Sequence, residues 1–304
     1  MDNGIKIATL IISSNTYPAK RNCNTQKKIF KLEGFEQNRT FWYKSGSKNH
    51  LNGEKYCLLN SDLLINTSDS SLNMGLKTIL ALEWLEKNID YDFVVRPTPS
   101  SYLNYKNLKN FITENLLEEE YVYAGKVQNT NNKSGEKIDF VSGSTLILNK
   151  KTVKAIIDNK NLWDHSYWDD VALSIVMNDL GIKPQFGDRF DIEGNPFKQN
   201  IPLNYYQYRC RTDNHYGYPR FLETSNLKIL HKIFSSQKIG IIKRGILFLY
   251  YEISKKLYIY QFGWKIFTLI RSIFKKLLPN KLYIFVKNRY IKQIENFKNV
   301  RFKF

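Results

Sequence analysis

The sequence of 304 residues is poor in the residues that build disulfide scaffolds and metal centres. Its three cysteines, Cys23, Cys57 and Cys210, lie far apart and form no C-x-x-C pair, so we expect neither a disulfide framework nor a cysteine-based zinc or redox site. The four histidines show no spacing typical of metal ligands. Also missing are the motifs G-x-x-x-x-G-K-S/T, G-x-G-x-x-G, G-x-S-x-G and H-E-x-x-H. These absences argue against P-loop ATPases, dinucleotide oxidoreductases, serine hydrolases and zinc enzymes.

Long apolar runs are missing as well. The longest stretches without a charged or polar break are far shorter than the roughly 20 residues that a membrane-spanning helix needs, so we expect no transmembrane segment. The first 15 residues combine acidic Asp2 with an apolar run broken by Ser and Asn, which is not typical of a secretory signal. With 42% hydrophobic and 24% charged residues, the chain has the composition of a folded protein with a substantial core.

Positive charge is abundant and unevenly distributed. The net charge is +18, and residues 238–304 hold 16 Lys or Arg against only Glu252 and Glu295, which is +14 and leaves +4 for residues 1–237. An excess of this kind favours partners such as anionic membranes, nucleic acids or phosphate-rich substrates. The asymmetry also marks a boundary, and we predict one domain over residues 1–232 and a basic tail over residues 233–304.

The order of apolar segments predicts an α/β fold with a largely parallel sheet, because candidate strands alternate with candidate helices. A polar, Asn-rich loop is expected over residues 128–135. The candidate strands cover residues 5–12, 56–59, 92–96, 121–124 and 140–148, the last broken at Gly143, and the candidate helices cover residues 21–30, 72–85, 103–117, 150–157 and 169–180. In such folds ligands bind at the carboxyl ends of the strands, so polar residues there are candidates for the site.

Two adjacent carboxylates, Asp169 and Asp170, begin the last of these helices. They have two interpretations. Acids in a first turn complement the helix dipole, or one of them caps the helix while the other faces a cleft as a general base toward a hydroxyl. The aromatic residues Trp163, Tyr167 and Trp168 just before them suit either stacking on a sugar ring or core packing.

Several sequence blocks, taken in order, resemble fringe-like and β-1,3-galactosyltransferase-like enzymes, and bacterial capsule and lipopolysaccharide glycosyltransferases are the nearest of these. The blocks are Leu72-x-x-x-Leu76-Lys77-Thr78-x-x-Ala81-x-x-Trp84, Tyr91-Asp92-Phe93-Val94-Val95-Arg96, Ser101-Tyr102-Leu103, Tyr123-Ala124-Gly125, Phe140-Val141-Ser142-Gly143-Ser144, Trp168-Asp169-Asp170-Val171-Ala172-Leu173 and Leu180-Gly181-Ile182. The resemblance implies a GT-A fold and transfer of a sugar from a nucleotide-sugar donor, a UDP-sugar above all, to an acceptor hydroxyl with inversion. It implies Asp170 as the general base and Asp169 as a helix cap or acceptor ligand.

The remaining site residues are predicted as two groups. The acceptor group combines the small residues in the block over 140–144 with the two tryptophans that precede the acidic helix. Its members are Ser142, Gly143, Ser144, Trp163 and Trp168. The donor group lies after the first strand and at the end of the strand over 92–96, and it includes two basic residues, Arg21 and Lys77, that are alternatively ordinary surface charges. Its members are Ser13, Ser14, Asn15, Arg21, Lys77, Arg96, Ser100 and Ser101.

One departure from the family pattern concerns the metal. The family places an acidic triplet for Mn²⁺ directly after this strand, whereas this chain has Thr98-Pro99-Ser100 there. Asp90 and Asp92 form an Asp-x-Asp, but it precedes the strand and lies at the wrong end for the site. We assign no metal ligand and leave dependence on Mn²⁺ or Mg²⁺ open.

Without a metal, the charge of a diphosphate leaving group needs basic side chains or helix ends. Four candidates lie within twelve residues: Arg209, Arg211, His215 and Arg220. They form either a phosphate clamp or a solvated loop with ion pairs, and the sequence weighs the two equally.

The basic tail contains two amphipathic segments, over residues 239–260 and 264–278, with apolar stripes opposite Lys and Arg. This pattern is typical of helices in a membrane interface. Alternatives are a helical subdomain packed on the first domain, a dimer contact and a nucleic-acid grip. We predict a glycosyltransferase of the cytoplasm, peripheral on the cytoplasmic face of an anionic membrane, that acts on a lipid-linked glycan in surface polysaccharide synthesis. Nucleic acid is not expected as its partner; the alternatives are a basic nucleic-acid-binding protein and a degenerate transferase that acts as a scaffold.

Overall fold

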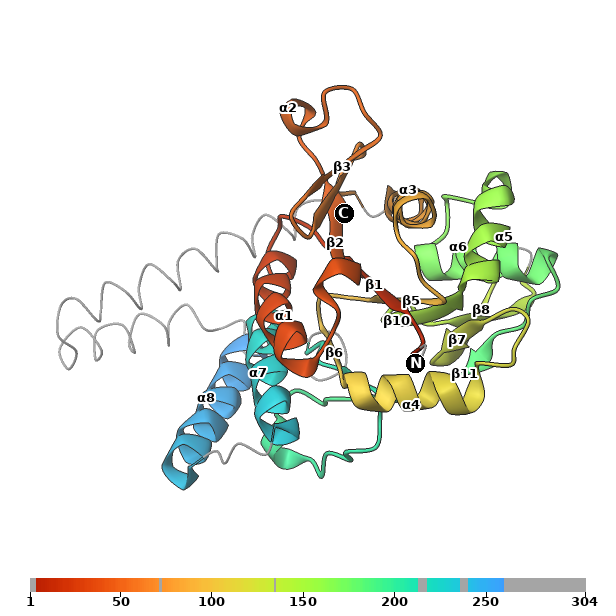
Figure 1. Cartoon of the computed structure of the whole chain (residues 1–304). Coiled ribbons are helices and arrows are strands. Elements are labelled where there is room, and N and C mark those ends of the chain that lie inside the picture. The colour runs from red at the N-terminus through yellow and green to blue at the C-terminus, as the bar shows by residue number, and fades with distance from the viewer. Residues whose placement is uncertain (1–3, 71–72, 134, 213–217, 236–239, 260–304) are drawn as a thin grey trace.

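The computed structural model of the chain describes residues 4–70, 73–133, 135–212, 218–235 and 240–259 (Figure 1). Its centre is an eight-stranded sheet with the strand order β11-β7-β10-β5-β1-β2-β4-β3. Six strands share one direction, and β3 and β10 run against it. The strands are β1 (Ile7–Ile12), β2 (Thr40–Ser45), β3 (Tyr56–Leu59), β4 (Asp62–Ile65), β5 (Phe93–Pro97), β7 (Tyr123–Gly125), β10 (Thr145–Asn149) and β11 (Gln185–Phe186).

Helices cover both faces of this sheet, which explains why β1 is apolar except at Thr9 and buried at every residue. On one face α1 (Ala19–Glu33), α4 (Tyr105–Asn115) and α7 (Glu223–Phe234) pack against Ile7 and Ile11. On the other face α3 (Met74–Asn88), α5 (Lys150–Asp158) and α6 (Asp169–Asp179) pack against Ala8 and Leu10. The α/β architecture with a mostly parallel sheet, predicted from the sequence, is confirmed.

Smaller elements complete the described part of the chain. A three-stranded sheet of β12 (Arg189–Asp191), β13 (Gln207–Arg209) and β6 (Ser101–Leu103) adjoins the carboxyl end of β5. The short helices are α2 (Lys48–Leu51), η1 (Gln37–Arg39), η3 (Lys160–Leu162), η4 (Pro196–Lys198) and η5 (Arg220–Leu222).

The polar loop predicted over 128–135 is wrong over its first half, because β8 (Val127–Asn131) pairs there with β9 (Lys137–Val141) in an antiparallel ribbon. Most side chains of β8 are exposed, and β8 carries no apolar alternation that a sequence pattern could detect.

The first amphipathic segment of the tail forms α8 (Ile241–Ile259), whose Tyr251 packs on Leu222 and Ile229 beside α7 (Figure 1). The second segment, over residues 264–278, lies outside the described residues. The domain boundary at residue 232 stays a prediction, and α7 continues across it to Phe234. No helix among the described residues combines the length and the apolar character needed to cross a bilayer.

Candidate active site

Part of the predicted site lies at one edge of the sheet, because several strands end there. β1, β2 and β5 run toward this edge and end at Ile12, Ser45 and Pro97. β10 runs in the opposite direction and begins there at Thr145, so the turn over residues 142–144 reaches the same edge. Loops at the carboxyl ends of parallel strands are where α/β sheets bind ligands.

Asp169 is tied to Arg96 in a buried ion pair, with only 9% and 3% of the two side chains exposed. The same guanidinium donates to the Tyr43 hydroxyl at 2.8 Å and to the Gly143 carbonyl oxygen at 3.3 Å. Asp169 makes no capping hydrogen bond to its helix, so the predicted cap is replaced by this ion pair. Arg96 holds Asp169 and the Gly143 turn in place, and donor contact by Arg96 stays a prediction.

Asp170 is half-buried and has a different environment from its neighbour. Its Oδ2 accepts a hydrogen bond from the Gly143 N–H at 2.8 Å, and its Oδ1 accepts one from the Val171 N–H at 3.1 Å. Burial and then the negative charge of Asp169 raise the pKa of Asp170, against the lowering effect of the Gly143 hydrogen bond and Arg96. A carboxylate with a raised pKa is a better proton acceptor, which is what a general base requires.

Gly143 lies in close contact with both charged groups. A Cβ atom on it would stand 3.1 Å from Asp170 Oδ2 and 3.3 Å from Arg96 Nη1, closer than about nine in ten real Cβ contacts. A side chain at this position therefore requires the carboxylate and the guanidinium to shift by a few tenths of an ångström.

The serines on both sides of Gly143 point into a buried polar cluster. The Arg189 Nη1 donates to Ser142 Oγ at 2.9 Å and to Ser144 Oγ at 3.0 Å. Gln207 Nε2 also donates to Ser144 Oγ at 3.0 Å. Both serines were predicted as acceptor residues, but in this structure they are buried, and their hydroxyls hold the turn through hydrogen bonds to Arg189 and Gln207. Arg189 and Gln207 were not predicted, since nothing near them in sequence distinguishes them from surface polar residues.

The two predicted tryptophans differ in exposure. Trp163 is 5% exposed and packs in the core beside Gly75, so core packing, not stacking on a sugar, is what the structure shows for it. Trp168 is 65% exposed and immediately precedes Asp169 at the start of α6. Of the two, Trp168 has the exposed ring that a sugar could stack on.

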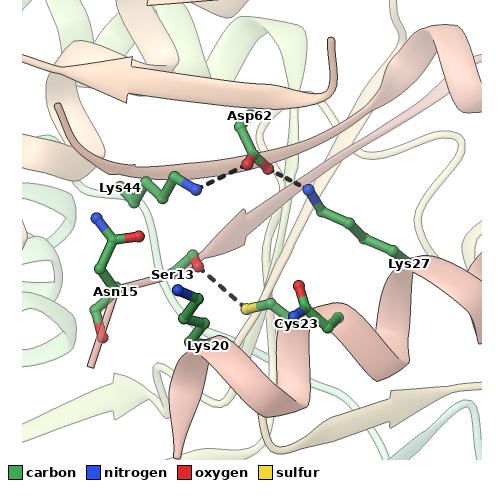
Figure 2. A pocket seen from close by; sticks show the side chains of 9 residues that line it. Ser13, Asn15, Lys20, Cys23, Lys27, Lys44 and Asp62 are labelled. Carbon is green, nitrogen blue, oxygen red and sulfur yellow. Dashed lines mark hydrogen bonds and ion pairs between the residues drawn. The ribbon is translucent and has the colours of Figure 1, made fainter. Parts of the chain in front are cut away.

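A polar pocket of about 200 Å³ lies beside the end of β1 (Figure 2). Figure 2 shows Lys27 and Lys44 reaching Asp62 from either side, with Lys20 at the start of α1 nearby; Lys44 Nζ lies 2.7 Å from Asp62. Burial would raise the pKa of Asp62, but the hydrogen bonds from Lys27 and Lys44 outweigh it and hold the pKa below its usual value. The lining residues are Ser13, Ser14, Asn15, Lys20, Cys23, Asn24, Lys27, Lys44 and Asp62.

This pocket carries an excess of positive charge, with three lysines against one aspartate. It contains the predicted donor residues Ser13, Ser14 and Asn15, whereas its lysines were not predicted. The charge balance and the loop at the end of a strand suit an anionic group such as a diphosphate.

Lys77 is joined to the same loop through an acid that the sequence did not single out. Its Nζ lies 2.6 Å from Asp69, which also accepts from Ser45 Oγ at 2.7 Å and from the Asn15 N–H at 3.5 Å. Lys77 is 2% exposed, so in this structure it holds Asp69 and the loop in place.

The other predicted donor residues have mainly structural contacts. Ser101 is fully buried and donates to the Ser144 carbonyl oxygen at 2.7 Å, which links the start of β6 to the Gly143 turn. Ser100 is also buried, and its carbonyl oxygen accepts from the Cys210 N–H at 2.7 Å. Arg21 lies half-buried in the first turn of α1 and is not among the residues that line the pocket.

Two of the four residues of the predicted phosphate clamp make ion pairs with acidic side chains. Arg209 lies 4.0 Å from Asp191, and Arg220 lies 2.7 Å from Glu223. Arg211 is half-buried and His215 lies outside the described residues. The contacts of Arg209 and Arg220 agree with the ion-pair alternative, and the clamp stays a prediction.

The residues at the family's metal position do not fit a divalent cation. Thr98 and Ser100 offer hydroxyls 3.4 Å apart where Mn²⁺ or Mg²⁺ prefers carboxylates. Asp90 and Asp92 stand before β5, where Asp90 pairs with Lys6 Nζ at 2.5 Å and Asp92 accepts from the Lys6 N–H at 2.8 Å. The described residues contain no group of three or more His, Cys, Asp or Glu side chains placed to hold a metal.

No protein-family profile and no curated protein matches this sequence. Among solved structures, the glycosyltransferase involved in the glycosylation of the major capsid of PBCV-1 is similar at 9% identity, covering 73% of this chain and 99% of that chain with a TM-score of 0.44. The galactosyltransferase LgtC, solved with donor and acceptor sugar analogs, is similar at 11% identity, covering 78% and 99% with a TM-score of 0.41. The 4-diphosphocytidyl-2C-methyl-D-erythritol synthase of Anaerococcus prevotii is similar at 10% identity, covering 61% and 90% with a TM-score of 0.39. At these values the likeness assigns neither a family nor a reaction to this chain.

Proposed function

We propose that this chain is a glycosyltransferase that uses Asp170 to deprotonate the acceptor hydroxyl. The observation that carries the proposal is the unequal pair of carboxylates at the edge of the sheet. Asp169 is neutralised by Arg96, while Asp170 is half-buried, has a raised pKa and is oriented by the Gly143 N–H. Two neighbouring carboxylates in such different environments are typical of an acid–base site.

The reaction is a single displacement. Asp170 takes the proton of the acceptor hydroxyl as its oxygen forms a bond to the anomeric carbon of the donor sugar. The bond between that carbon and the diphosphate oxygen breaks, and the nucleoside diphosphate leaves with the electron pair. Attack from the face opposite the leaving group inverts the anomeric configuration.

The leaving group carries negative charge that must be stabilised. The three lysines of the pocket beside the end of β1, Lys20, Lys27 and Lys44, supply positive charge that would stabilise it. Trp168 has an exposed ring on which the acceptor sugar could stack. Hydroxyls stand where the resembling enzymes have their acidic triplet for the metal, so in this proposal the lysines neutralise the leaving group.

The finer part of the proposal concerns the substrates. The resemblance of the sequence blocks supports a UDP-sugar as donor, and the basic tail supports a lipid-linked glycan acceptor on the cytoplasmic face of a membrane. Together these features fit a step in bacterial surface polysaccharide synthesis.

Replacement of the base tests the proposal. Asp170→Asn keeps the shape and one of the two backbone hydrogen bonds that the carboxylate accepts, and we expect transfer to fall by roughly 10²- to 10⁴-fold with donor binding unchanged. Asp179→Asn is the matched control, since Asp179 is exposed at the other end of the same helix, and it should keep full activity. Transfer by Asp170→Asn within a few-fold of the parent would remove Asp170 from the mechanism.

A nucleic-acid-binding function is the alternative, favoured by the +14 charge of residues 238–304. It requires affinity for DNA or RNA that falls steeply with salt. It gives no reason for the environments of Asp169 and Asp170. A degenerate transferase that only scaffolds partners would bind a nucleotide sugar or acceptor without turnover in any acceptor screen.

A further inference from the structure

One side of α8 is apolar and exposed. Ile246, Leu249, Tyr250 and Ile253 are 63%, 59%, 46% and 53% exposed, and their spacing of three and four residues places them on one face of the helix. We call these four residues the α8 stripe. The opposite face holds Tyr251, which is fully buried.

The contacts of the buried face fix α8 on the domain. The Tyr251 hydroxyl donates to Asn226 Oδ1 at 2.5 Å. Glu252, the one acidic residue in α8, is 2.7 Å from Lys198 Nζ and accepts from the Tyr218 hydroxyl at 3.0 Å. Because α8 is packed on the domain through its other face, the α8 stripe faces away from the domain. The Glu252 carboxylate already has its partners on the domain, Lys198 and Tyr218.

The stripe continues toward the candidate site. The Tyr250 ring lies 6.0 Å from the Phe221 ring, centroid to centroid, and Tyr250 is one of the nearby groups that, after burial, raise the pKa of the Tyr17 hydroxyl. Tyr17 is 36% exposed and belongs to the loop between β1 and α1, which also carries Ser14 and Asn15 of the pocket. In Figure 1, α8 lies beside α7 on the side of the molecule away from α5 and α6.

The charge of the residues that follow α8 in the sequence indicates what covers this surface. Residues 260–304 begin at the end of α8 and hold 11 Lys or Arg against one Glu. An apolar helix face next to a strongly basic segment fits the boundary between anionic headgroups and acyl chains. A second copy of this chain fits less well, because each copy carries a net charge of +18 and the two would repel.

We propose that the α8 stripe, with Tyr17, docks on an anionic lipid bilayer. Docking there brings the β1–α1 loop and the pocket beside it to the membrane surface. Its use in delivering a lipid-linked acceptor rests on the proposed function, whereas lipid binding itself does not.

The test is cosedimentation of the full chain with sucrose-loaded vesicles of phosphatidylcholine, with and without phosphatidylglycerol. The wild-type chain should bind the anionic vesicles and bind pure phosphatidylcholine far more weakly. Leu249→Ser/Ile253→Ser should bind the anionic vesicles at least tenfold more weakly, since each large aliphatic side chain withheld from lipid lowers partitioning by roughly tenfold. Leu58→Ser/Leu59→Ser is the matched control, since these two leucines of β3 are 40% and 43% exposed, and it should bind within twofold of wild type.

Two results would overturn the proposal. One is vesicle binding by Leu249→Ser/Ile253→Ser equal to wild type, with an unchanged circular dichroism spectrum. The other is a wild-type dimer that the same substitutions convert to a monomer in light scattering, which would make the stripe an interface between copies. Asp170→Asn should bind vesicles like wild type, so loss of the proposed function and loss of membrane binding are distinguishable.

Discussion

The buried ion pair between Arg96 and Asp169 gives the sharpest stability prediction. Arg96→Met removes the cation and leaves the Asp169 carboxylate buried, with Asp170 beside it. The side chains are 3% and 9% exposed, so solvent cannot replace the lost partner. Removing one partner of such a pair costs about 3–5 kcal/mol. The hydrogen bonds from Arg96 to Tyr43 and Gly143 are lost as well, which favours the upper half of that range.

This cost converts to a fall in melting temperature of roughly 6–20 °C, at about 2–4 °C per kcal/mol for a domain of this size. Urea unfolding followed by far-ultraviolet circular dichroism measures the free energy directly. In a double-mutant cycle, Arg96→Met/Asp169→Leu should be less destabilised than the sum of the single changes by at least about 1 kcal/mol. Lys133→Met, which breaks the exposed pair with Asp164, is the control and should leave the midpoint unchanged. Additive effects in the cycle, or a cost of Arg96→Met as small as the control's, would refute the reasoning.

Three further predictions concern the site. Because the pKa of Asp170 is raised and the base must be ionised, kcat/KM should fall with decreasing pH at a midpoint above 3.8. The ionised form of Asp170 also lowers the stability of the fold. Asp170→Asn should therefore be more stable than wild type at neutral pH and lose this advantage below pH 3.8. A pH–rate profile with a midpoint at or below 3.8 would contradict this. Gly143→Ala places a Cβ 3.1 Å from Asp170 Oδ2 and should lower kcat by roughly 10- to 100-fold with little change in donor KM; an equal effect on both would place the defect in binding. Lys44→Met should raise the donor KM by roughly tenfold or more, whereas Lys137→Met on the exposed ribbon should not, and equal KM values for the two variants would remove the pocket from donor binding.

The sequence predicted the elements whose pattern is local. β1 and β5 are short apolar runs buried on both faces, and α6 begins at the acidic pair, so each was recognisable alone. β2 was missed although it holds Phe41, Trp42 and Tyr43. A run of three aromatic residues between Thr40 and Lys44 has neither the alternation of a half-exposed strand nor the length of a helix, and only its pairing with β1 and β4 makes it a strand.

The sequence could predict the position of the candidate site but not its contacts. The ends of β1 and β5 and the start of α6 are the features that place the candidate site at this edge of the sheet. The ion pair between Arg96 and Asp169 joins residues 73 positions apart, and the pocket lysines come from α1 and β2. In sequence each of these lysines is an ordinary surface charge, because only the packing of α1 beside β1 and β2 brings them together. Trp163 and Trp168 show the same limit, since their opposite exposures depend on tertiary packing.

Nucleotide-sugar binding by the wild-type chain tests the central claim most directly. A thermal-shift screen of nucleotide sugars, each with and without Mn²⁺, should find at least one that stabilises the protein. At a concentration one hundred times the dissociation constant the gain is about 2.7 kcal/mol, or roughly 5–10 °C. A shift that persists in EDTA would agree with the absence of an acidic triplet after β5. No shift with any nucleotide sugar, together with a clear shift with DNA or RNA, would contradict the account.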